Sequence, residues 1–228
     1  MSAEGGRLPS ANLAVSRYEF STDCIVRLLG AAPSPVVFDI GAGDGRLAAP
    51  TRAAGGSWQG FDLRTSLPEI RAWNLELPCP TEGAAAGIVL LLDVIEHLVN
   101  PGCALGNIGA VLPSGGFLVL TTPNPRWSRS RIHALFHGVP ACFTEMDLER
   151  NGHVFTPWPH ILMKMLDGAG FDIEDYVTLD GRTGWPERPI TLRYPLRLGH
   201  AMLNMLIERL DSSACGMSYG LIASKRWA

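Results

Sequence analysis

The feature that most constrains the fold of this chain is a short apolar run that leads directly into glycines. Residues 36–38 are Val-Val-Phe, and the segment that follows them reads Asp39-Ile40-Gly41-Ala42-Gly43-Asp44-Gly45. Glycine adopts positive φ angles and leaves room where a ligand approaches the backbone, so the order predicts a buried strand and then a ligand-binding turn. We expect a helix next, whose unpaired amide groups and positive dipole end face the same space.

The glycine spacing argues against one common ligand of such turns. The dinucleotide fingerprint is Gly-x-Gly-x-x-Gly, and Arg46 occupies the place of its third glycine. Asp39 also precedes the first glycine, where its charge would repel a pyrophosphate and suit a ligand that carries an amino group. An oxidoreductase that uses NAD is therefore disfavoured.

A second strand with an acidic end follows after one helix-sized interval. The segment 58–63 reads Trp-Gln-Gly-Phe-Asp-Leu, so that Asp62 lies 17 residues beyond Gly45. Nucleotide-binding α/β units place a strand-end carboxylate near this separation, where it meets the ribose hydroxyls. The two acids and the turn together predict a nucleoside site.

Strands and helices then alternate along most of the chain. Continuously apolar strands separated by helices are typical of a parallel sheet covered on both faces. The expected strands are 36–40, 58–62, 87–92, 117–122, 171–179 and 217–224. The expected helices are 16–29, 45–54, about 67–72, 102–112, one that starts at Thr156-Pro157, and 196–210.

Several further motifs agree in order and spacing with one known family. They are residues 74–78 (Asn-Leu-Glu-Leu-Pro), the apolar run 84–92, residues 93–98 (Asp-Val-Ile-Glu-His-Leu), the turn 113–116 and residues 117–124. Over residues 15–180 the chain resembles the class I S-adenosylmethionine-dependent methyltransferases, and within them the ubiquinone-biosynthesis O-methyltransferase type. The resemblance implies an α/β fold with a Rossmann-like, doubly wound, seven-stranded sheet, mostly parallel with one antiparallel strand.

The resemblance also implies a cofactor, S-adenosyl-L-methionine, with S-adenosyl-L-homocysteine as product. Asp62 would hold the ribose hydroxyls, Leu63 would pack on the adenine, and Asp93 would lie near the methyl group. Asn74 stands where the family usually has an acid, but its side-chain oxygen still accepts a hydrogen bond. The full set of expected cofactor-binding residues is Asp39, Gly41, Ala42, Gly43, Gly45, Asp62, Leu63, Asn74, Leu75 and Asp93.

The cluster Asp93-x-x-Glu96-His97 carries the catalytic expectations. Histidine is the natural general base for a hydroxyl acceptor, so His97 is the first candidate and His153 the second. Two alternatives stay open. Glu96 and His97 can brace the following helix, or can join a later histidine around a divalent cation, as in the small-RNA 3′-terminal 2′-O-methyltransferases that have a similar cluster. A cation is possible but not favoured.

Two segments are expected to shape the acceptor side. Residues 123–154 form a long irregular loop, typical of a lid or substrate-binding insertion. The added helix at 195–210 could form a hydrophobic wall, a membrane-facing surface, a dimer face or part of the core. The side chains of interest in the loop are Arg126, Trp127, Arg129 and Arg131, which can bind a carboxylate, a phosphate or a ring or form a solvated face, together with His133, His137 and Phe143.

Composition limits the remaining possibilities. The chain of 228 residues is long enough for one sizeable domain, which we expect to span 1–228 with residues 1–12 disordered. The net charge of −3 does not indicate a nucleic-acid-binding domain, because such domains are usually strongly basic. The 5 cysteines contain no C-x-x-C pair, residues 1–10 contain no apolar core, and the longest apolar run is too short to span a bilayer. We therefore expect a cytoplasmic protein, monomeric or homodimeric.

The resemblance and these observations together predict a methyltransferase that acts on a small-molecule acceptor, with oxygen in a biosynthetic pathway as the favoured acceptor atom. One alternative is a metal-dependent RNA 2′-O-methyltransferase, which would need a basic surface that this chain lacks. Another is a non-catalytic protein that binds S-adenosylmethionine and acts as a scaffold.

Overall fold

The computed structural model describes residues 9–65, 67–185 and 194–227, and its centre is an eight-stranded sheet. The strands are β1 (Ala11–Asn12), β2 (Val36–Ile40), β3 (Ser57–Asp62), β4 (Ile70–Ala72), β5 (Ile88–Leu92), β6 (Phe117–Pro123), β7 (Phe171–Leu179) and β8 (Ser218–Lys225). Their order across the sheet is β1-β7-β8-β6-β5-β2-β3-β4. Strand β8 runs antiparallel to both of its neighbours, and the other pairs are parallel. The predicted α/β fold is confirmed, with eight strands instead of seven.

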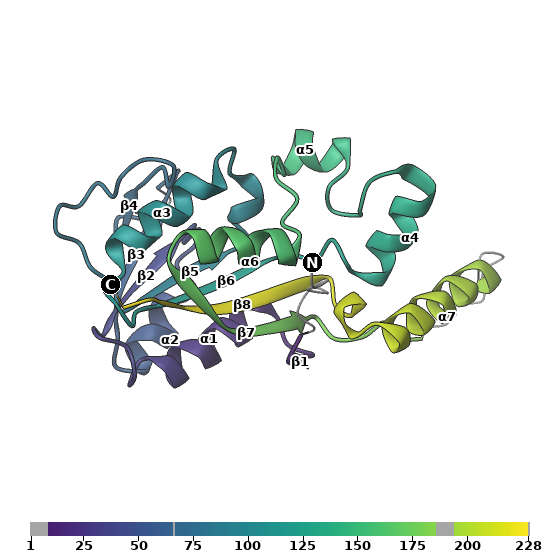
Figure 1. Cartoon of the computed structure of the whole chain (residues 1–228), viewed down its shortest axis with the longest axis horizontal. Coiled ribbons are helices and arrows are strands. Elements are labelled where there is room, and N and C mark those ends of the chain that lie inside the picture. Colours follow the sequence, from purple (N-terminus) through teal and green to yellow (C-terminus); the bar gives the residue numbers. More distant parts are fainter. Residues whose placement is uncertain (1–8, 66, 186–193, 228) are drawn as a thin grey trace, which may run out of the picture.

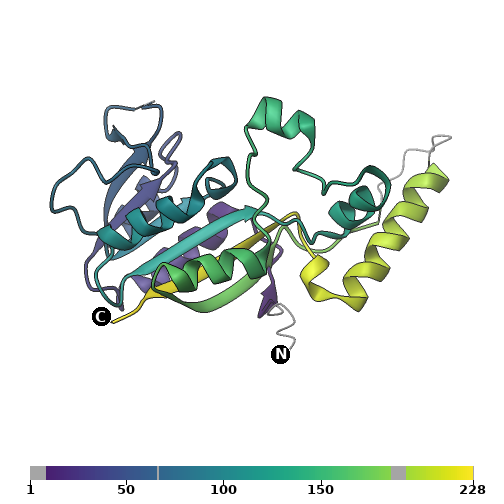
Figure 2. The same cartoon turned by 45° about the horizontal axis from the view of Figure 1, so that its top comes forward.

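Helices cover both faces of this sheet, as the alternating pattern predicts. Figure 1 shows α1 and α2 on one face and α3 and α6 on the other, whereas α4, α5 and α7 lie beyond one end of the sheet, which the turned view of Figure 2 also shows. None of the described helices is both long and apolar enough to cross a bilayer. The helices are α1 (Arg17–Leu28), α2 (Ala48–Ala53), α3 (Pro101–Val111), α4 (Ser128–His137), α5 (Glu145–Asn151), α6 (Pro159–Gly168) and α7 (Tyr194–Leu210), with the 3-10 turns η1 (Ile95–His97) and η2 (Ser212–Ala214).

Strand β5, at the centre of the sheet, is apolar at every position because both of its faces are buried. Successive side chains of a strand point to opposite faces. In β5, Val89 and Leu91 therefore join the core under α3 and α6, whereas Ile88 and Leu90 join the core under α1. This arrangement fixes the carboxyl ends of the parallel strands along one edge of the sheet.

The sequence prediction was wrong for residues 67–72, which form no helix. Ile70 pairs with Gly60 of β3, and the amide of Trp73 donates to the carbonyl of Asp62 at 2.9 Å. Pairing along the free edge of β3 satisfies these backbone groups, which a helix of this length would leave largely unpaired. The helix expected at 45–54 begins only at Ala48, because the turn continues through a bond from Gly45 to the carbonyl of Ala42.

Three other boundaries differ from the prediction. Helix α6 begins at Pro159 after Trp158, two residues beyond the expected Thr156-Pro157 start. Residues 123–154 are not irregular throughout, since they contain α4 and α5, and α5 begins at a capping box between Thr144 and Asp147. Of the residues expected to be disordered, 1–8 lie outside the described residues, but 11–12 form β1 and pair with β7.

Gly87, just before β5, offers a test of the close packing that positions the central strand. A Cβ at this position would lie 1.9 Å from the carbonyl oxygen of Ser34, whereas a Cβ at Gly106, on the exposed side of α3, would meet nothing within 4 Å. We expect Gly87→Ala to lower the free energy of unfolding by about 2 kcal/mol or more. Gly106→Ala should raise it by about 0.5–1 kcal/mol. Urea denaturation measures both, and similar stabilities for the two variants would contradict this packing.

Candidate functional site

A cavity of about 320 Å³ opens at the carboxyl ends of β2, β3 and β5. Open α/β sheets bind their ligands at this edge, where the strand order reverses. Strand β2 lies between β3 and β5 here, so the ends of all three strands meet. Seven of the predicted site residues line this cavity, which we call the crevice: Gly41, Asp62, Leu63, Asn74, Leu75, Asp93 and His97.

The glycine turn is held onto the end of β3. The amides of Gly41 and Ala42 donate to the carbonyl of Phe61 at 2.8 and 3.0 Å, and the amide of Gly43 donates to Oδ2 of Asp62 at 2.9 Å. Gly41 has φ +77°, and a Cβ there would lie 2.3 Å from Cγ2 of Val94. A side chain at this position would therefore clash, which explains the glycine.

Asp39 lies beneath the turn and is buried. Its Oδ2 accepts a hydrogen bond from the indole Nε1 of Trp58 at 3.1 Å. Burial raises the pKa of Asp39 to about 6, and the charges of Asp62 and Asp44 add to the shift. Together with Gly41, Ala42 and Gly43, Asp39 lines a second, smaller cavity beside the crevice.

Gly45 is the predicted cofactor-binding residue that lies apart from the others. It lines neither of these two cavities, and its α-carbon faces Leu67 and Trp58. Its φ of +71° instead lets the chain leave the turn toward α2.

Asp93 follows β5 in a backbone conformation that is uncommon for a residue with a side chain, with φ +52°. Its Oδ1 accepts from Oγ1 of Thr121 at 2.9 Å, and its Oδ2 forms an ion pair with Arg17 of α1. Burial raises the pKa of Asp93, although Arg17 and the Thr121 hydrogen bond oppose the shift. Sequence reasoning missed Arg17, because nothing local indicates that the first residue of α1 faces the end of β5.

The start of α1 also contacts the glycine turn. The guanidinium carbons of Arg17 and Arg46 lie 5.0 and 5.1 Å from the ring centroid of Tyr18. Tyr18 and Arg46 line the smaller cavity with Asp39. The first turn of α1 therefore closes one side of the site, which the sequence alone did not indicate.

Glu96 is the most deeply buried acid of the cluster, at 1% exposed. Its Oε2 accepts from Oγ1 of Thr122 at 2.9 Å, whereas Oε1 has no hydrogen-bond partner among the described residues. Burial raises the pKa of Glu96 to about 8, with a further contribution from Asp93. The backbone carbonyl of Glu96 accepts from the amides of Val154 and Phe155 at 2.9 and 3.0 Å, which brings the segment with the second histidine beside it.

The two predicted histidines lie together in space. The ring centroids of His97 and His153 are 4.9 Å apart at 68°. Nδ1 of His153 lies 2.6 Å from the carbonyl oxygen of Cys142, so we assign the proton to Nδ1, which leaves Nε2 as an acceptor or ligand. Burial lowers the pKa of His97, and His153 lowers it further.

Glu96, His97 and His153 can therefore act on a proton or hold a cation. One ligand atom from each lies within 4.8 Å of the others. A carboxylate oxygen and two imidazole nitrogens suit a divalent cation. A neutral histidine beside a cavity equally suits a general base.

The arginines predicted for the acceptor side do not act as one cluster. Arg131 forms an ion pair with Asp211 at 2.6 Å and donates to the carbonyl of Arg126 at 2.7 Å, so it joins the start of α4 to the segment before η2. Arg129 instead lies over the ring of Trp127 at 5.1 Å. Of the other candidates, Phe143 lies 5.7 Å from the ring of His153. His133 and His137 contact each other on α4, with ring centroids 4.4 Å apart.

Comparison with known proteins shows which family this chain belongs to. Residues 16–176 match the family model of the methyltransferase domain. The chain is 31% identical over 105 residues to a ubiquinone biosynthesis O-methyltransferase of Bradyrhizobium sp. (strain ORS 278), an alignment that covers 40% of this chain and 41% of that protein. It is 27% identical over 176 residues to a protein of the same name from Psychrobacter arcticus (strain DSM 17307 / VKM B-2377 / 273-4), covering 69% of this chain and 65% of the relative. The chain therefore spans less than two thirds of the length of either relative.

The fold has relatives among solved structures. A SAM-dependent methyltransferase from Archaeoglobus fulgidus superposes with a TM-score of 0.60 at 17% identity, over 92% of this chain and 95% of that one. The predicted resemblance is confirmed at the level of family and fold. The chain belongs to the methyltransferase domain family and shares the fold of S-adenosylmethionine-dependent methyltransferases.

Proposed function

We propose that this protein transfers a methyl group from S-adenosylmethionine to an oxygen of a small-molecule acceptor. The observation that carries the proposal is the crevice at the ends of β2, β3 and β5, where six of the ten expected cofactor residues and His97 line one cavity. The relatives named ubiquinone biosynthesis O-methyltransferase support an oxygen acceptor and a biosynthetic role.

The residues of the crevice fit the parts of the cofactor. Asp62 uses one oxygen to hold the turn and has further lone pairs for the ribose hydroxyls. Leu63 is 70% exposed at the opening of the crevice, where an adenine ring would cover it. Oδ1 of Asn74 accepts from the amide of Glu76 at 3.1 Å and keeps a second lone pair for the adenine amino group.

The cofactor would supply an electrophilic methyl group, and the protein would place the acceptor oxygen in line with it. Positioning provides much of the rate in such a displacement. His97 would accept the hydroxyl proton as the oxygen–carbon bond forms and the carbon–sulfur bond breaks. The lowered pKa of His97 suits this role, because the ring is then neutral and able to accept a proton at pH 7.

The metal-assisted alternative rests on the grouping of Glu96, His97 and His153. A divalent cation there would polarise the acceptor hydroxyl, and His97 would act as a ligand and not as a base. A net charge of −3 does not favour RNA as the acceptor. We also propose a cytoplasmic location, because the 5 cysteines are all free thiols.

The cofactor assignment predicts a binding defect in Asp62→Asn. Loss of charge-assisted hydrogen bonds costs about 1.5–3 kcal/mol, so the dissociation constants of S-adenosylmethionine and S-adenosylhomocysteine should rise at least about tenfold. Isothermal titration calorimetry measures both, with NAD as a negative control. Asp23→Asn, in an exposed ion pair with Arg27 on α1, is the matched control and should bind normally. Unchanged affinity in Asp62→Asn would remove the cofactor assignment.

The catalytic assignment predicts that His97→Gln lowers kcat by about 10²-fold, the contribution typical of a general base, with little change in cofactor affinity. Release of S-adenosylhomocysteine with catechol as probe acceptor measures this, with and without magnesium or EDTA. His160→Gln, on α6, is the control, since this exposed ring lies outside the crevice, 6.4 Å from the ring of Trp158 and tilted from it by 50°. A variant that mainly unfolds would favour the bracing role, and activity abolished by EDTA in the wild type would favour the cation.

The contact between the two histidines predicts a shift in titration. In the wild type the pKa of His97 should lie below the ordinary value of about 6.5. His153→Gln removes one of the two causes and should raise the pKa of His97 toward that value. Carbon-detected NMR titration of the imidazole Cε1 signals measures the pKa of His97 in the wild type and in the variant. The same pKa in both proteins would show that His153 has no electrostatic effect on His97.

A further inference from the structure

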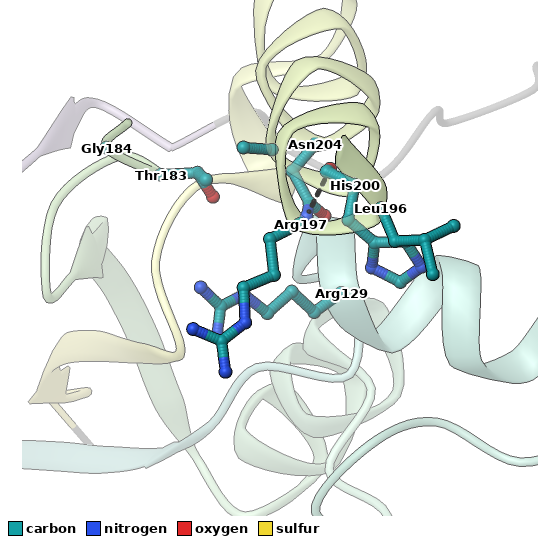
Figure 3. Close-up of a pocket in the computed structure, with 8 residues that line it drawn as sticks. Arg129, Thr183, Gly184, Leu196, Arg197, His200 and Asn204 are labelled. Atoms are coloured by element: carbon teal, nitrogen blue, oxygen red, sulfur yellow. Dashed lines mark hydrogen bonds between the residues drawn. The ribbon is translucent and has the colours of Figure 1, made fainter. Parts of the chain in front are cut away.

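A second large cavity, of about 530 Å³, lies away from the crevice (Figure 3). It is formed by α4, by α7 and by the residues that follow β7, and it shares no lining residue with the crevice. Cavities of about 300–1,000 Å³ hold most small-molecule ligands. The side chains that matter here are Arg129, Arg197, His200, Asn204, Thr183 and Leu196.

Two arginines make the lining of this cavity positively charged. In Figure 3 the side chains of Arg129 of α4 and Arg197 of α7 extend the same way and bring their guanidinium groups into the cavity. Within residues 9–65, 67–185 and 194–227, no carboxylate forms an ion pair with either of them. Two cations that face one cavity repel each other, and an anion between them would remove the repulsion.

The buried acid of α7, Glu208, does not neutralise these two arginines, because its carboxylate bonds to hydroxyl and amide groups. Glu208 of α7 is 2% exposed, and its carboxylate accepts from Oγ1 of Ser128 at 2.8 Å and from the amide and Oγ1 of Thr183 at 2.9 and 2.5 Å. These bonds fix the start of α4 and residue 183 around α7. Glu208 therefore holds together the segments that line the cavity, and among the described residues it forms no ion pair with Arg129 or Arg197.

The cavity lies at the same edge of the sheet as the crevice. Arg129 is six residues beyond the end of β6, the strand whose Thr121 and Thr122 bond to Asp93 and Glu96. On the other side, Asp180 directly follows β7 and lies close enough to Asp93 to raise its pKa. The segments after β6 and β7 thus place the cavity at the sheet edge where the predicted catalytic residues also lie.

An apolar cavity of about 370 Å³ adjoins the cationic one and shares Arg129 and His200 with it. Trp127, Ile132 and Phe136 line this neighbouring space. The two together would accommodate a molecule with a charged group at one end and an apolar or aromatic part at the other.

We propose that Arg129 and Arg197 bind an oxyanion, a carboxylate or a phosphate monoester, that is carried by the methyl acceptor. The planar guanidinium groups would make paired hydrogen bonds with the oxyanion, and an apolar part next to it would contact Trp127 and Phe136. The hydroxyl to be methylated would extend from there to His97 in the crevice. The inference rests on the proposed function, because it identifies the ligand as the acceptor.

Calorimetry with benzoate and phenyl phosphate as probes tests the site, and benzyl alcohol is the uncharged control. The wild type should bind at least one of the two anions and not the alcohol, and the tighter anion distinguishes a carboxylate from a phosphate. Arg129→Gln and Arg197→Gln should each weaken anion binding at least about tenfold, as expected for loss of a charge-assisted pair. Arg209→Gln is the matched control, since this exposed arginine of α7 lines neither cavity.

Titration of the same preparations with S-adenosylmethionine separates this proposal from the proposed function. Binding of S-adenosylmethionine without binding of either anion, or anion affinity unchanged in both arginine variants, would overturn the oxyanion site. Anion binding at the arginines without any binding of S-adenosylmethionine would overturn the assignment of the ligand to a methyl acceptor. Equal melting temperatures of the variants and the wild type would show that a loss of binding is not a loss of fold.

Discussion

The candidate site depends first on how the glycine turn is fastened to the neighbouring strand. The carbonyl of Phe61 accepts from two amides of the turn, and the carboxylate of Asp62 accepts from a third. The end of β3 therefore sets the path of the backbone that leaves β2. Since the side chain of Val94 occupies the space where a Cβ of Gly41 would lie, the end of β5 constrains the same turn from the other side. The contacts of the turn thus hold the ends of β2, β3 and β5 in fixed positions, and the crevice lies between them.

The charges around Glu96 limit what this part of the site can do. With a pKa of about 8 the carboxyl group is mostly protonated at pH 7, and it then adds no charge beside Asp93. A cation bound by Glu96, His97 and His153 would reverse this, because it would favour the ionised carboxylate and the neutral imidazoles. The backbone of Glu96 meanwhile bonds to Val154 and Phe155 whatever its side chain does. Bracing therefore does not exclude base or cation chemistry, since part of the brace is made by the main chain and does not occupy the side chains that the chemistry would use.

Sequence reasoning was most successful where the determinant is local. The apolar runs of β2 and β5, the glycine turn and the strand-end acids are each read within a few residues, and the structure brings them to one edge. It was wrong at residues 70–72, where pairing with β3 decides the conformation. It also missed the ion pair between Arg17 and Asp93, since the partners are 76 positions apart and no short pattern joins them. Tertiary contacts of this kind become visible only once the sheet order is known.

The same distinction explains why the proposed cofactor side of the site could be predicted from the sequence more fully than the proposed acceptor side. The proposed cofactor side is built from the ends of β2, β3 and β5 and the short segments that follow them, so each of its residues can be read from a strand end in the sequence. The proposed acceptor side is assembled from α4, the segment after β7 and α7, which are distant in sequence and meet through Glu208 and its hydroxyl partners. A buried acid that joins such segments fixes the positions of the cationic side chains around them without contacting the ligand. Arg129 and Arg197 face one cavity for this structural reason, and the chemistry of the acceptor would then follow from where those two segments are held.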